Sequence, residues 1–440
     1  MSCDPSIVRS RRDFLKQAML AGTATLSAGS LLPARPALAA RGPNEKLNLA
    51  CIGVANKGGH NIDQLTNENI VALCDIDSVF LGKSSEKFPQ AKTYTDFRKM
   101  FDAEKNLDAV VVSTPDHTHA IPVMWALNRG LDVYCEKPLA HSVYEVRQMR
   151  NLAAEKKAVT QMGTQIHAGD NYRRVVEIIK AGQIGPVSRV HVWLGGSIRP
   201  GKRATEGTPP KTVDYDLWIG PAPMRPYSAA HFHFNWRYWW DFGGGSLADF
   251  GCHYMDLPFW ALDLRYPTSV VAKGEKTSTG DNDVPDNMQV DYYFPARGNQ
   301  PPVHMTWYHG AWKPPGAEDY DKTSAVLFES GNGSGRLLAD YGTRKLFMLD
   351  GSEPAPPPQS IPNSIGHWAE WADACRTRGK TTCNFDYSGA LAEAALLGNV
   401  SYRAGGQKLD WDAEKLRATN TSDADQYIRR EYRKGWTLEG

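Results

Sequence analysis

Two side chains at helical spacing, Asp249 and His253, could form an acid–base pair in the segment GGGSLADFGCHYMD, residues 243–256. Side chains four positions apart in a helix share a face and can meet. Histidine supplies a base near neutral pH, and aspartate can fix its orientation or share its proton network. A structural capping pair is the alternative. A metal ion would need a third strong ligand, so we predict no metal site.

Lys137 is a third candidate, in the sequence Glu136-Lys137-Pro138 directly after the apolar run Leu131–Cys135. If that run is a buried parallel strand, Lys137 lies at its carboxyl end, where open α/β sheets bind ligands. A lysine there can hydrogen-bond a substrate hydroxyl and lower its pKa as a hydride leaves. The alternative is a surface lysine before a helix-starting proline.

A glycine turn near the start of the chain predicts a dinucleotide site. The apolar run Leu47–Ile52 is typical of a buried parallel strand. Gly53, Ala55 and Gly58 follow in the positions of G-x-G-x-x-G/A, and a helix is expected over Gly58–Leu65. Gly53 permits the tight turn, and Gly58 allows the helix to pack closely on the strand. The pyrophosphate would lie on the free N–H groups of the helix N-terminus.

Asp75 follows the next apolar run, Ile70–Leu73, at the position of the acidic residue of this pattern. Its carboxylate can accept hydrogen bonds from the adenosine ribose and would repel a 2′-phosphate. We therefore predict NAD as the cofactor in preference to NADP. Ala55 is the departure from the pattern, because its methyl group crowds the pyrophosphate. An α/β domain that has lost its nucleotide is the alternative.

The surrounding pattern predicts the elements that must position these groups. Strands over 107–113 and 131–135 flank a helix over 121–129, which predicts a doubly wound parallel sheet, an α/β Rossmann domain over 46–166. From Val187 onward, strands without regular intervening helices predict an α+β domain with a largely antiparallel sheet. These strands are expected at 187–195, 269–274, 288–294, 303–308, 324–329, 336–339 and 345–349. Helices are expected at 171–181, 246–262, 365–377 and 388–403.

The first 39 residues predict an export signal. Ser10–Lys16 (SRRDFLK) is typical of a twin-arginine region, and a modestly apolar segment, Ala18–Leu32, follows. Ala37-Leu38-Ala39 suits cleavage before Ala40. We therefore expect a periplasmic or otherwise exported protein whose partner is the twin-arginine export machinery. Because no NAD pool exists outside the cytoplasm, such an enzyme would have to keep its cofactor and regenerate it.

Composition excludes some function classes. Lysine plus arginine (50) balances aspartate plus glutamate (49), so no strong positive field suggests a nucleic acid partner. Cys51, Cys74 and Cys135 fall in or beside expected buried strands and are interpreted as small core residues. Cys375 and Cys383 flank a turn and could form a disulfide in an oxidising compartment. The sequence contains no C-x-x-C pair, so nothing indicates a structural zinc site.

Taken together, these motifs resemble the glucose–fructose oxidoreductase / inositol dehydrogenase / MocA (Gfo/Idh/MocA) family, in its exported branch. The resemblance is carried by the glycine turn, by S-T-P-x-x-x-H at residues 113–119, by E-K-P at 136–138 and by the D-x-x-x-H helix. It implies a Rossmann domain followed by an open-faced sheet domain, residues 167–440, that binds substrate and supports homo-oligomers.

The resemblance also implies roles for individual residues. Lys137, Asp249 and His253 match the catalytic trio. The residues implied to bind the cofactor, beside those of the glycine turn, are Thr114, Pro115, His119 and Glu136. The residues implied to lie near the substrate are Gln165, His167, Trp236 and Arg237, although the last two could instead build an oligomer surface.

The function expected from these observations is oxidation of a sugar or polyol hydroxyl, with hydride passing to tightly held NAD and the proton handled by Lys137 and His253. One alternative is an NAD-dependent glycosidase that works by transient oxidation and elimination. Another is a periplasmic binding protein without catalysis. In each case the small-molecule partner is a carbohydrate or glycoside.

Overall fold

The computed structural model describes residues 42, 45–196 and 203–439. The expected export signal therefore lies outside the described residues. None of the helices in the described part of the chain is long and apolar enough to cross a membrane.

Residues 48–162 form a six-stranded parallel sheet in the order β3-β2-β1-β4-β5-β6. This is the strand order of a doubly wound dinucleotide-binding fold, as the sequence predicts. Its strands are β1 (Asn48–Ile52), β2 (Asn69–Cys74), β3 (Lys92–Tyr94), β4 (Ala109–Val112), β5 (Asp132–Cys135) and β6 (Thr160–Met162). Its helices are α2 (Lys57–Asp63), α3 (Ser78–Lys87), α4 (Phe97–Ala103), α5 (Ala120–Asn128) and α6 (Val143–Lys156), with the 3₁₀ turn η1 (Asp116–Thr118).

Residues 187–418 contain the strands of a nine-stranded sheet in the order β13-β12-β11-β7-β10-β9-β8-β14-β15. Only β7 and β10 pair in parallel; the other named pairs are antiparallel, in agreement with the expected α+β pattern. The strands are β7 (Val187–Leu194), β8 (Ser269–Glu275), β9 (Asn287–Phe294), β10 (Val303–His309), β11 (Ser324–Ser330), β12 (Gly335–Ala339), β13 (Arg344–Met348), β14 (Leu409–Asp412) and β15 (Arg417–Ala418).

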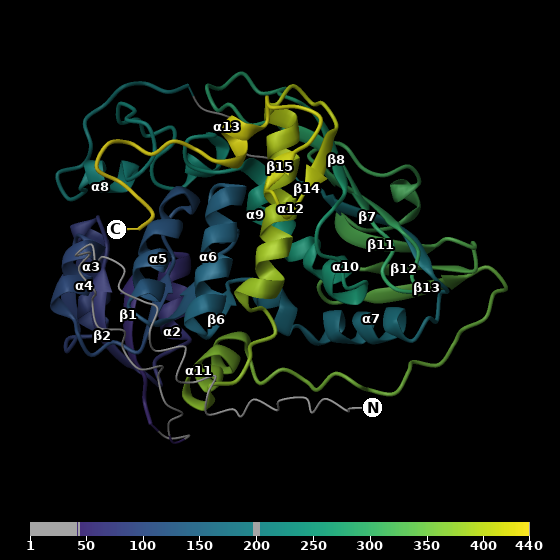
Figure 1. The fold of residues 1–440 in the computed structure, drawn as a ribbon, viewed down its shortest axis with the longest axis horizontal. Coiled ribbons are helices and arrows are strands. Elements are labelled where there is room, and N and C mark those ends of the chain that lie inside the picture. Colours follow the sequence, from purple (N-terminus) through teal and green to yellow (C-terminus); the bar gives the residue numbers. More distant parts are fainter. Residues whose placement is uncertain (1–41, 43–44, 197–202, 440) are drawn as a thin grey trace, which may run out of the picture. The chain divides into compact units, whose positions relative to one another are not determined.

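Helices that follow β6 in the sequence pack against elements of both sheets. The helical elements are η2 (Gln165–Ala168), α7 (Asp170–Lys180), α8 (Tyr215–Ile219), η3 (Asn235–Tyr238), α9 (Gly245–Tyr254), α10 (Asp256–Ala261), η4 (Ala317–Asp319), α11 (His367–Thr377), α12 (Phe385–Arg403) and α13 (Asp425–Ile428). The long helix α12 lies beside α6 and also packs on α9 and β8 (Figure 1). One apolar core therefore runs from β1, β4 and β5 to β8, β9 and β10.

Two expectations differ from the structure. The helix expected at 246–262 is two helices, because α9 ends at Tyr254 and α10 begins at Asp256. Cys375 and Cys383 are separate free thiols, so the possible disulfide was wrong. They belong to different core clusters, Cys375 with β1 and β2 and Cys383 with α12 and the second sheet. Cys51, Cys74 and Cys135 are buried, as expected.

Gly58 tests the close packing of α2 on the sheet. A β-carbon at Gly58 would lie 2.0 Å from Gly53 O, so alanine must displace backbone. We expect Gly58→Ala to lower the free energy of unfolding by about 1–3 kcal/mol, measured by denaturant titration. Gly82→Ala in α3 is the matched control, because no atom lies within 4 Å of its added β-carbon. That control should be neutral or stabilising by up to about 1 kcal/mol, and equal effects of the two variants would contradict the packing argument.

Candidate active site

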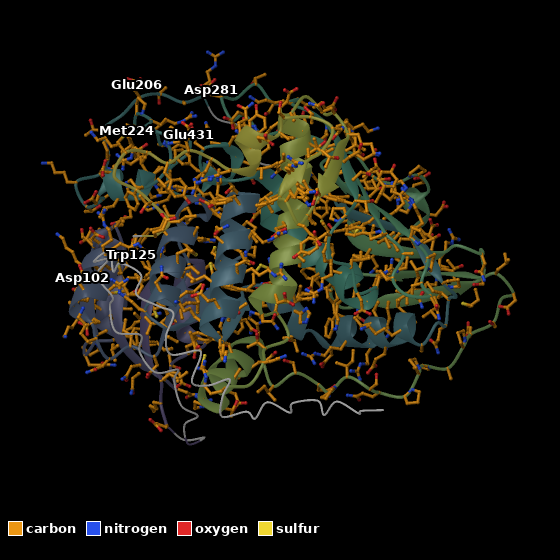
Figure 2. The ribbon with its side chains drawn as sticks, viewed as in Figure 1. Asp102, Trp125, Glu206, Met224, Asp281 and Glu431 are labelled. Carbon is orange, nitrogen blue, oxygen red and sulfur yellow. The ribbon has the colours of Figure 1, made fainter. Side chains whose placement is uncertain are left out.

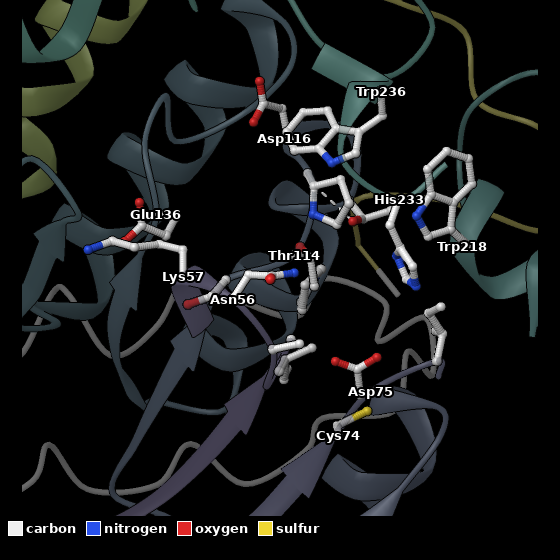
Figure 3. A pocket seen from close by; sticks show the side chains of 18 of the residues that line it. Asn56, Lys57, Cys74, Asp75, Thr114, Asp116, Glu136, Trp218, His233 and Trp236 are labelled. Carbon is white, nitrogen blue, oxygen red and sulfur yellow. Dashed lines mark hydrogen bonds and ion pairs between the residues drawn. The ribbon is translucent and has the colours of Figure 1, made fainter. Parts of the chain in front are cut away.

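A cleft of about 440 Å³ opens where the carboxyl ends of the parallel strands meet α9 and residues 203–242. Residues of the glycine turn, of the ends of β2, β4 and β5, and of α9 all line it (Figure 3). The sequence-predicted site residues that line this cleft are Gly53, Ala55, Asp75, Thr114, Pro115, Glu136, Lys137, Gln165, Trp236, Arg237, Asp249 and His253.

Lys137 and Asp249 form the central contact of the cleft. Lys137 Nζ donates to the Asp249 carboxylate (Oδ1, 2.5 Å) and to the Asp249 carbonyl oxygen (2.7 Å). Arg237 Nε also lies 3.3 Å from Asp249 Oδ1. Although burial opposes ionisation, Lys137 and Arg237 hold the pKa of Asp249 well below its usual range. The pKa of Lys137 is raised because attraction to Asp249 outweighs burial and repulsion by Arg237.

His253 is a neutral base in this arrangement. Burial, together with repulsion by Lys137, lowers its pKa to about 3, although attraction to Asp249 opposes the shift. Among the described residues no hydrogen bond joins the His253 ring to Asp249, so the aspartate binds the lysine and Arg237 rather than orienting the histidine. His253 Nδ1 is buried without a protein partner. The imidazole is therefore unprotonated at neutral pH, which is the state that a general base requires.

The glycine turn has the geometry that a dinucleotide requires. Gly53 has φ +81°, and a β-carbon there would lie 2.6 Å from Ser113 O. Ala55 lines the cleft without a positive φ, whereas Asn56, next to it, has φ +51°. The backbone thus requires no glycine at position 55.

Asp75 lies in the cleft at the end of β2 (Figure 3). It accepts hydrogen bonds from Val54 N (2.9 Å) and Asp77 N (3.0 Å), which fix the carboxylate. Burial raises its pKa in spite of these bonds. Each oxygen retains a second lone pair, so the fixed carboxylate can still accept a ribose hydroxyl.

Thr114 and Glu136 each have a buried polar atom without a protein partner. Thr114 Oγ1 and Glu136 Oε2 are buried and accept or donate no hydrogen bond. Glu136 is fixed through its other oxygen, which accepts from Asn61 Nδ2 (2.9 Å). Gly163 is required beside it, since a β-carbon there would lie 2.5 Å from Glu136 Oε1. Unpaired buried polar groups of this kind fit a bound polar cofactor.

Residues 203–242, here named the covering segment, extend over the half of the cleft beside Asp75. Thr212 O accepts from Ser78 N (2.8 Å), and Asp214 N donates to Ile76 O (2.9 Å). His233 Nε2 lies 3.2 Å from Asp77 Oδ2, and Figure 3 shows His233 and Trp218 opposite Asp75.

Residues 429–439, here named the C-terminal tail, lie on the covering segment. Arg433 donates to Gly220 O (Nε, 3.0 Å) and pairs with Asp216. Arg430 Nη2 donates to His117 O (2.6 Å), and Trp436 lines the cleft. Figure 2 labels Met224 and Glu431 on these two segments. The half of the cleft beside Asp75 is thus enclosed by chain segments that are remote in sequence.

Three of the expected site residues do not line the cleft. Gly58 packs α2 against Gly53, as its position predicts. His119 is 1 % exposed, and its Nε2 lies 2.7 Å from Thr114 O. It supports the cleft wall from behind, so the expectation that it lines the cofactor was wrong.

His167 is the third. Its Nδ1 lies 2.9 Å from Asp256 Oδ1, and its ring stacks on Trp260. It is directed into the core rather than the cleft, which corrects its expected place near the substrate. With Asp256 and Cys383 it brings three possible metal ligands within 4.8 Å. Asp256 is already satisfied by His167 and by Tyr387 Oη (2.7 Å), so the contacts need no ion.

Sequence reasoning missed several cleft residues, namely Asp116, His233, Phe234, Phe250 and Trp436. Asp116 stands inside the S-T-P-x-x-x-H segment and Phe250 stands between Asp249 and His253, so proximity to motifs was an available signal. His233, Phe234 and Trp436 belong to no such motif, and their positions in the cleft depend on long-range contacts.

This strand order, glycine turn and Asp75 define an NAD-binding Rossmann protein. A family model described as "Oxidoreductase family, NAD-binding Rossmann fold" matches residues 47–164. Its companion, "Oxidoreductase family, C-terminal alpha/beta domain", matches residues 191–295. The chain belongs to the Gfo/Idh/MocA oxidoreductase family.

Individual relatives agree with this assignment. The chain is 28% identical over 230 residues to a glycosyl hydrolase family 109 protein of Stenotrophomonas maltophilia, covering 48% of this chain and 47% of that protein. It is 28% identical over 153 residues to inositol 2-dehydrogenase of Salmonella paratyphi B, covering 33% and 45%. The chain thus spans about half the length of the curated relatives it matches.

The fold resembles the WlbA dehydrogenase of Chromobacterium violaceum, solved with NADH and UDP-GlcNAcA. The TM-score is 0.63 at 18% identity, covering 86% of this chain and 99% of that one.

Buried neutral histidines predict acid sensitivity. Burial lowers the pKa of His117 from 6.5 to about 3. Between these two pH values His117 is protonated in the unfolded state and neutral in the folded state. Stability should therefore fall as pH drops below 6.5, with His117 contributing about 1.4 kcal/mol per pH unit down to about pH 3. In His117→Gln this part of the slope should vanish from urea titrations run across the range. Exposed His60→Gln is the control, and an unchanged slope in His117→Gln would refute a neutral His117.

Proposed function

We propose that the protein is an exported oxidoreductase that keeps NAD bound and oxidises a hydroxyl group of a sugar or polyol. The convergence of Lys137, Asp249 and His253 in a cleft that begins at the glycine turn carries this proposal. Kinship with inositol 2-dehydrogenase supports the substrate class.

The charge states of His253 and Lys137 decide which step of the oxidation each residue assists. When bound, NAD supplies the acceptor for the hydride that leaves the substrate carbon. His253, being neutral, accepts the hydroxyl proton. Lys137 has a third N–H besides the two that bind Asp249, and this N–H can donate to the substrate oxygen as negative charge develops there. The substrate thereby loses one hydride and one proton and becomes a carbonyl compound.

Retention of the cofactor follows from the cover over the cleft. The glycine turn, Thr114 and Glu136 would hold the nicotinamide half and pyrophosphate, and Asp75 would hold the adenosine ribose. The covering segment and the C-terminal tail enclose that half, which supports slow release. Slow release in turn fits export through the twin-arginine machinery to a compartment without NAD. The open face of the nine-stranded sheet is the surface proposed for homo-oligomers.

An NAD-dependent glycosidase is the second candidate, because the match to the glycosyl hydrolase family 109 protein extends over 230 residues. In that reaction, transient oxidation acidifies the neighbouring C–H bond, elimination expels the aglycone and the hydride is returned. The test is release of nitrophenol from nitrophenyl glycosides without accumulation of reduced cofactor. Release of nitrophenol would replace the first proposal by the second.

His253 gives the direct test of oxidation. The mature protein is purified without added cofactor and its absorbance is followed while sugars and polyols are added. We expect a band of reduced nicotinamide in the wild type and a loss of at least about 10²-fold in rate for His253→Ala, with bound NAD unchanged. His304→Ala, on the second sheet, is the control. Loss of bound NAD from His253→Ala would indicate a structural role instead.

Arg433 tests the cover. Arg433→Ala removes the contacts that join the tail to Asp216 and Gly220. We expect bound NAD to dissociate about tenfold faster, because charge-assisted hydrogen bonds of the cover are lost. Nucleotide remaining after timed dialysis is the measurement, and Lys434→Ala, at the exposed neighbouring position, is the matched control. Equal rates of NAD release from the two variants would show that the contacts of the C-terminal tail do not retain the cofactor.

A further inference from the structure

A second carboxyl group, Asp116, lies in the catalytic cleft beside the catalytic trio. It begins η1, lines the cleft and is 7 % exposed. Figure 3 shows it on the far side of the pocket from Asp75. The turn that carries it is fixed on both sides, because His117 Nε2 lies 2.8 Å from Trp218 O and His119 Nε2 lies 2.7 Å from Thr114 O.

Asp116 and Asp249 have different environments in the same cleft. Asp249 contacts both local cations, Lys137 at 2.5 Å and Arg237 at 3.3 Å. In the described part of the chain, no lysine, arginine or histidine nitrogen lies within 4.0 Å of the Asp116 carboxyl. Asp116 interacts with Lys137 and Arg237 only at longer range and is repelled by Asp249.

This difference separates the charge states of the two groups. Burial raises the pKa of Asp116 to about 7, although Lys137 and Arg237 oppose the shift. Asp249 stays ionised. Two carboxyl groups whose environments move their pKa values apart divide donor and acceptor roles between them. Asp249 is held by Lys137 and Arg237, and in the proposed reaction Lys137 and His253 act on the reacting hydroxyl. Asp116 is the remaining carboxyl group of the cleft, and in its protonated form it can donate to a different substrate oxygen.

We propose that Asp116, a buried carboxyl group that lines the cleft without a cation partner, is a specificity-determining group whose protonated form donates a hydrogen bond to a substrate oxygen beside the reacting hydroxyl. The inference rests on the proposed function and narrows its substrate class. A buried donor placed for a second oxygen discriminates against substrates that lack that oxygen. The preferred substrates are then vicinal diols, as in sugars and cyclic polyols, rather than isolated secondary alcohols. No covalent bond changes at Asp116.

The protonation state is tested without turnover. Infrared difference spectra between the NAD-bound wild type and Asp116→Asn are recorded from about pH 6 to about pH 9. We expect a protonated-carboxyl band of the wild type at the acid end that converts to a carboxylate band near pH 7. Asp102→Asn, at an exposed aspartate of α4 outside the cleft, is the control and should leave this band in place. A carboxylate band alone at every pH would overturn the proposal.

The role toward substrate is tested by the pH dependence of kcat/KM for the best sugar and for its analogue deoxygenated beside the reacting carbon. We expect kcat/KM of the wild type to fall above about pH 7, as Asp116 loses its proton. Asp116→Asn keeps an N–H donor that does not titrate, so this limb should disappear. Asp116→Leu should lose about tenfold with the sugar and little with the deoxy analogue.

Persistence of the limb in Asp116→Asn, or equal losses of Asp116→Leu on sugar and analogue, would overturn the assignment of Asp116. A wild type that reduces no cofactor with any sugar would instead overturn the proposed function, and the infrared experiment would still decide the protonation of Asp116.

Discussion

The contact between Lys137 and Asp249 is the constraint on which the site depends. Lys137 follows β5 of the parallel sheet, and Asp249 belongs to α9 from the second half of the chain. A buried ammonium group is stable only with a partner, so the two halves must meet at this point. The same contact places His253, one helical turn along α9, at the cleft wall. The cleft is therefore complete only where the two sheets pack together.

The beginning of α9 has its own backbone requirement. Gly245 has φ +62°, and a β-carbon at Gly243 would lie 2.7 Å from Arg237 Cα. The glycines thus allow η3, which carries Arg237, to approach the helix that carries Asp249. Arg237 is held between Phe234 and Trp236, with distances of 4.7 and 4.3 Å to their ring centroids. Its guanidinium is positioned by aromatic side chains and in turn fixes the carboxylate.

Burial determines the charge states throughout this region. His117, His119, His253 and His367 all have lowered pKa values, with burial as the largest cause in each case. Two of these neutral imidazoles, His119 and His253, lie near the ionised Lys137–Asp249 pair. The cleft therefore contains one ion pair, Lys137–Asp249, beside a histidine that burial keeps neutral, His253. The charge state of each side chain depends on its burial and neighbours as well as on its residue type.

The sequence by itself determined the local elements: the strand, glycine turn and helix of residues 48–63, Asp75 at the end of β2, and the helical spacing of Asp249 and His253. These follow from periodicity and backbone conformation, which act over a few residues. Only the tertiary structure decided that Asp249 binds Lys137 and Arg237, that His119 and His167 turn away from the cleft, and that the covering segment and tail enclose it. Lys137 and Asp249 are 112 positions apart, and Arg433 and Gly220 are 213 positions apart. Such contacts depend on how the two sheets pack, and local periodicity carries no information about that packing.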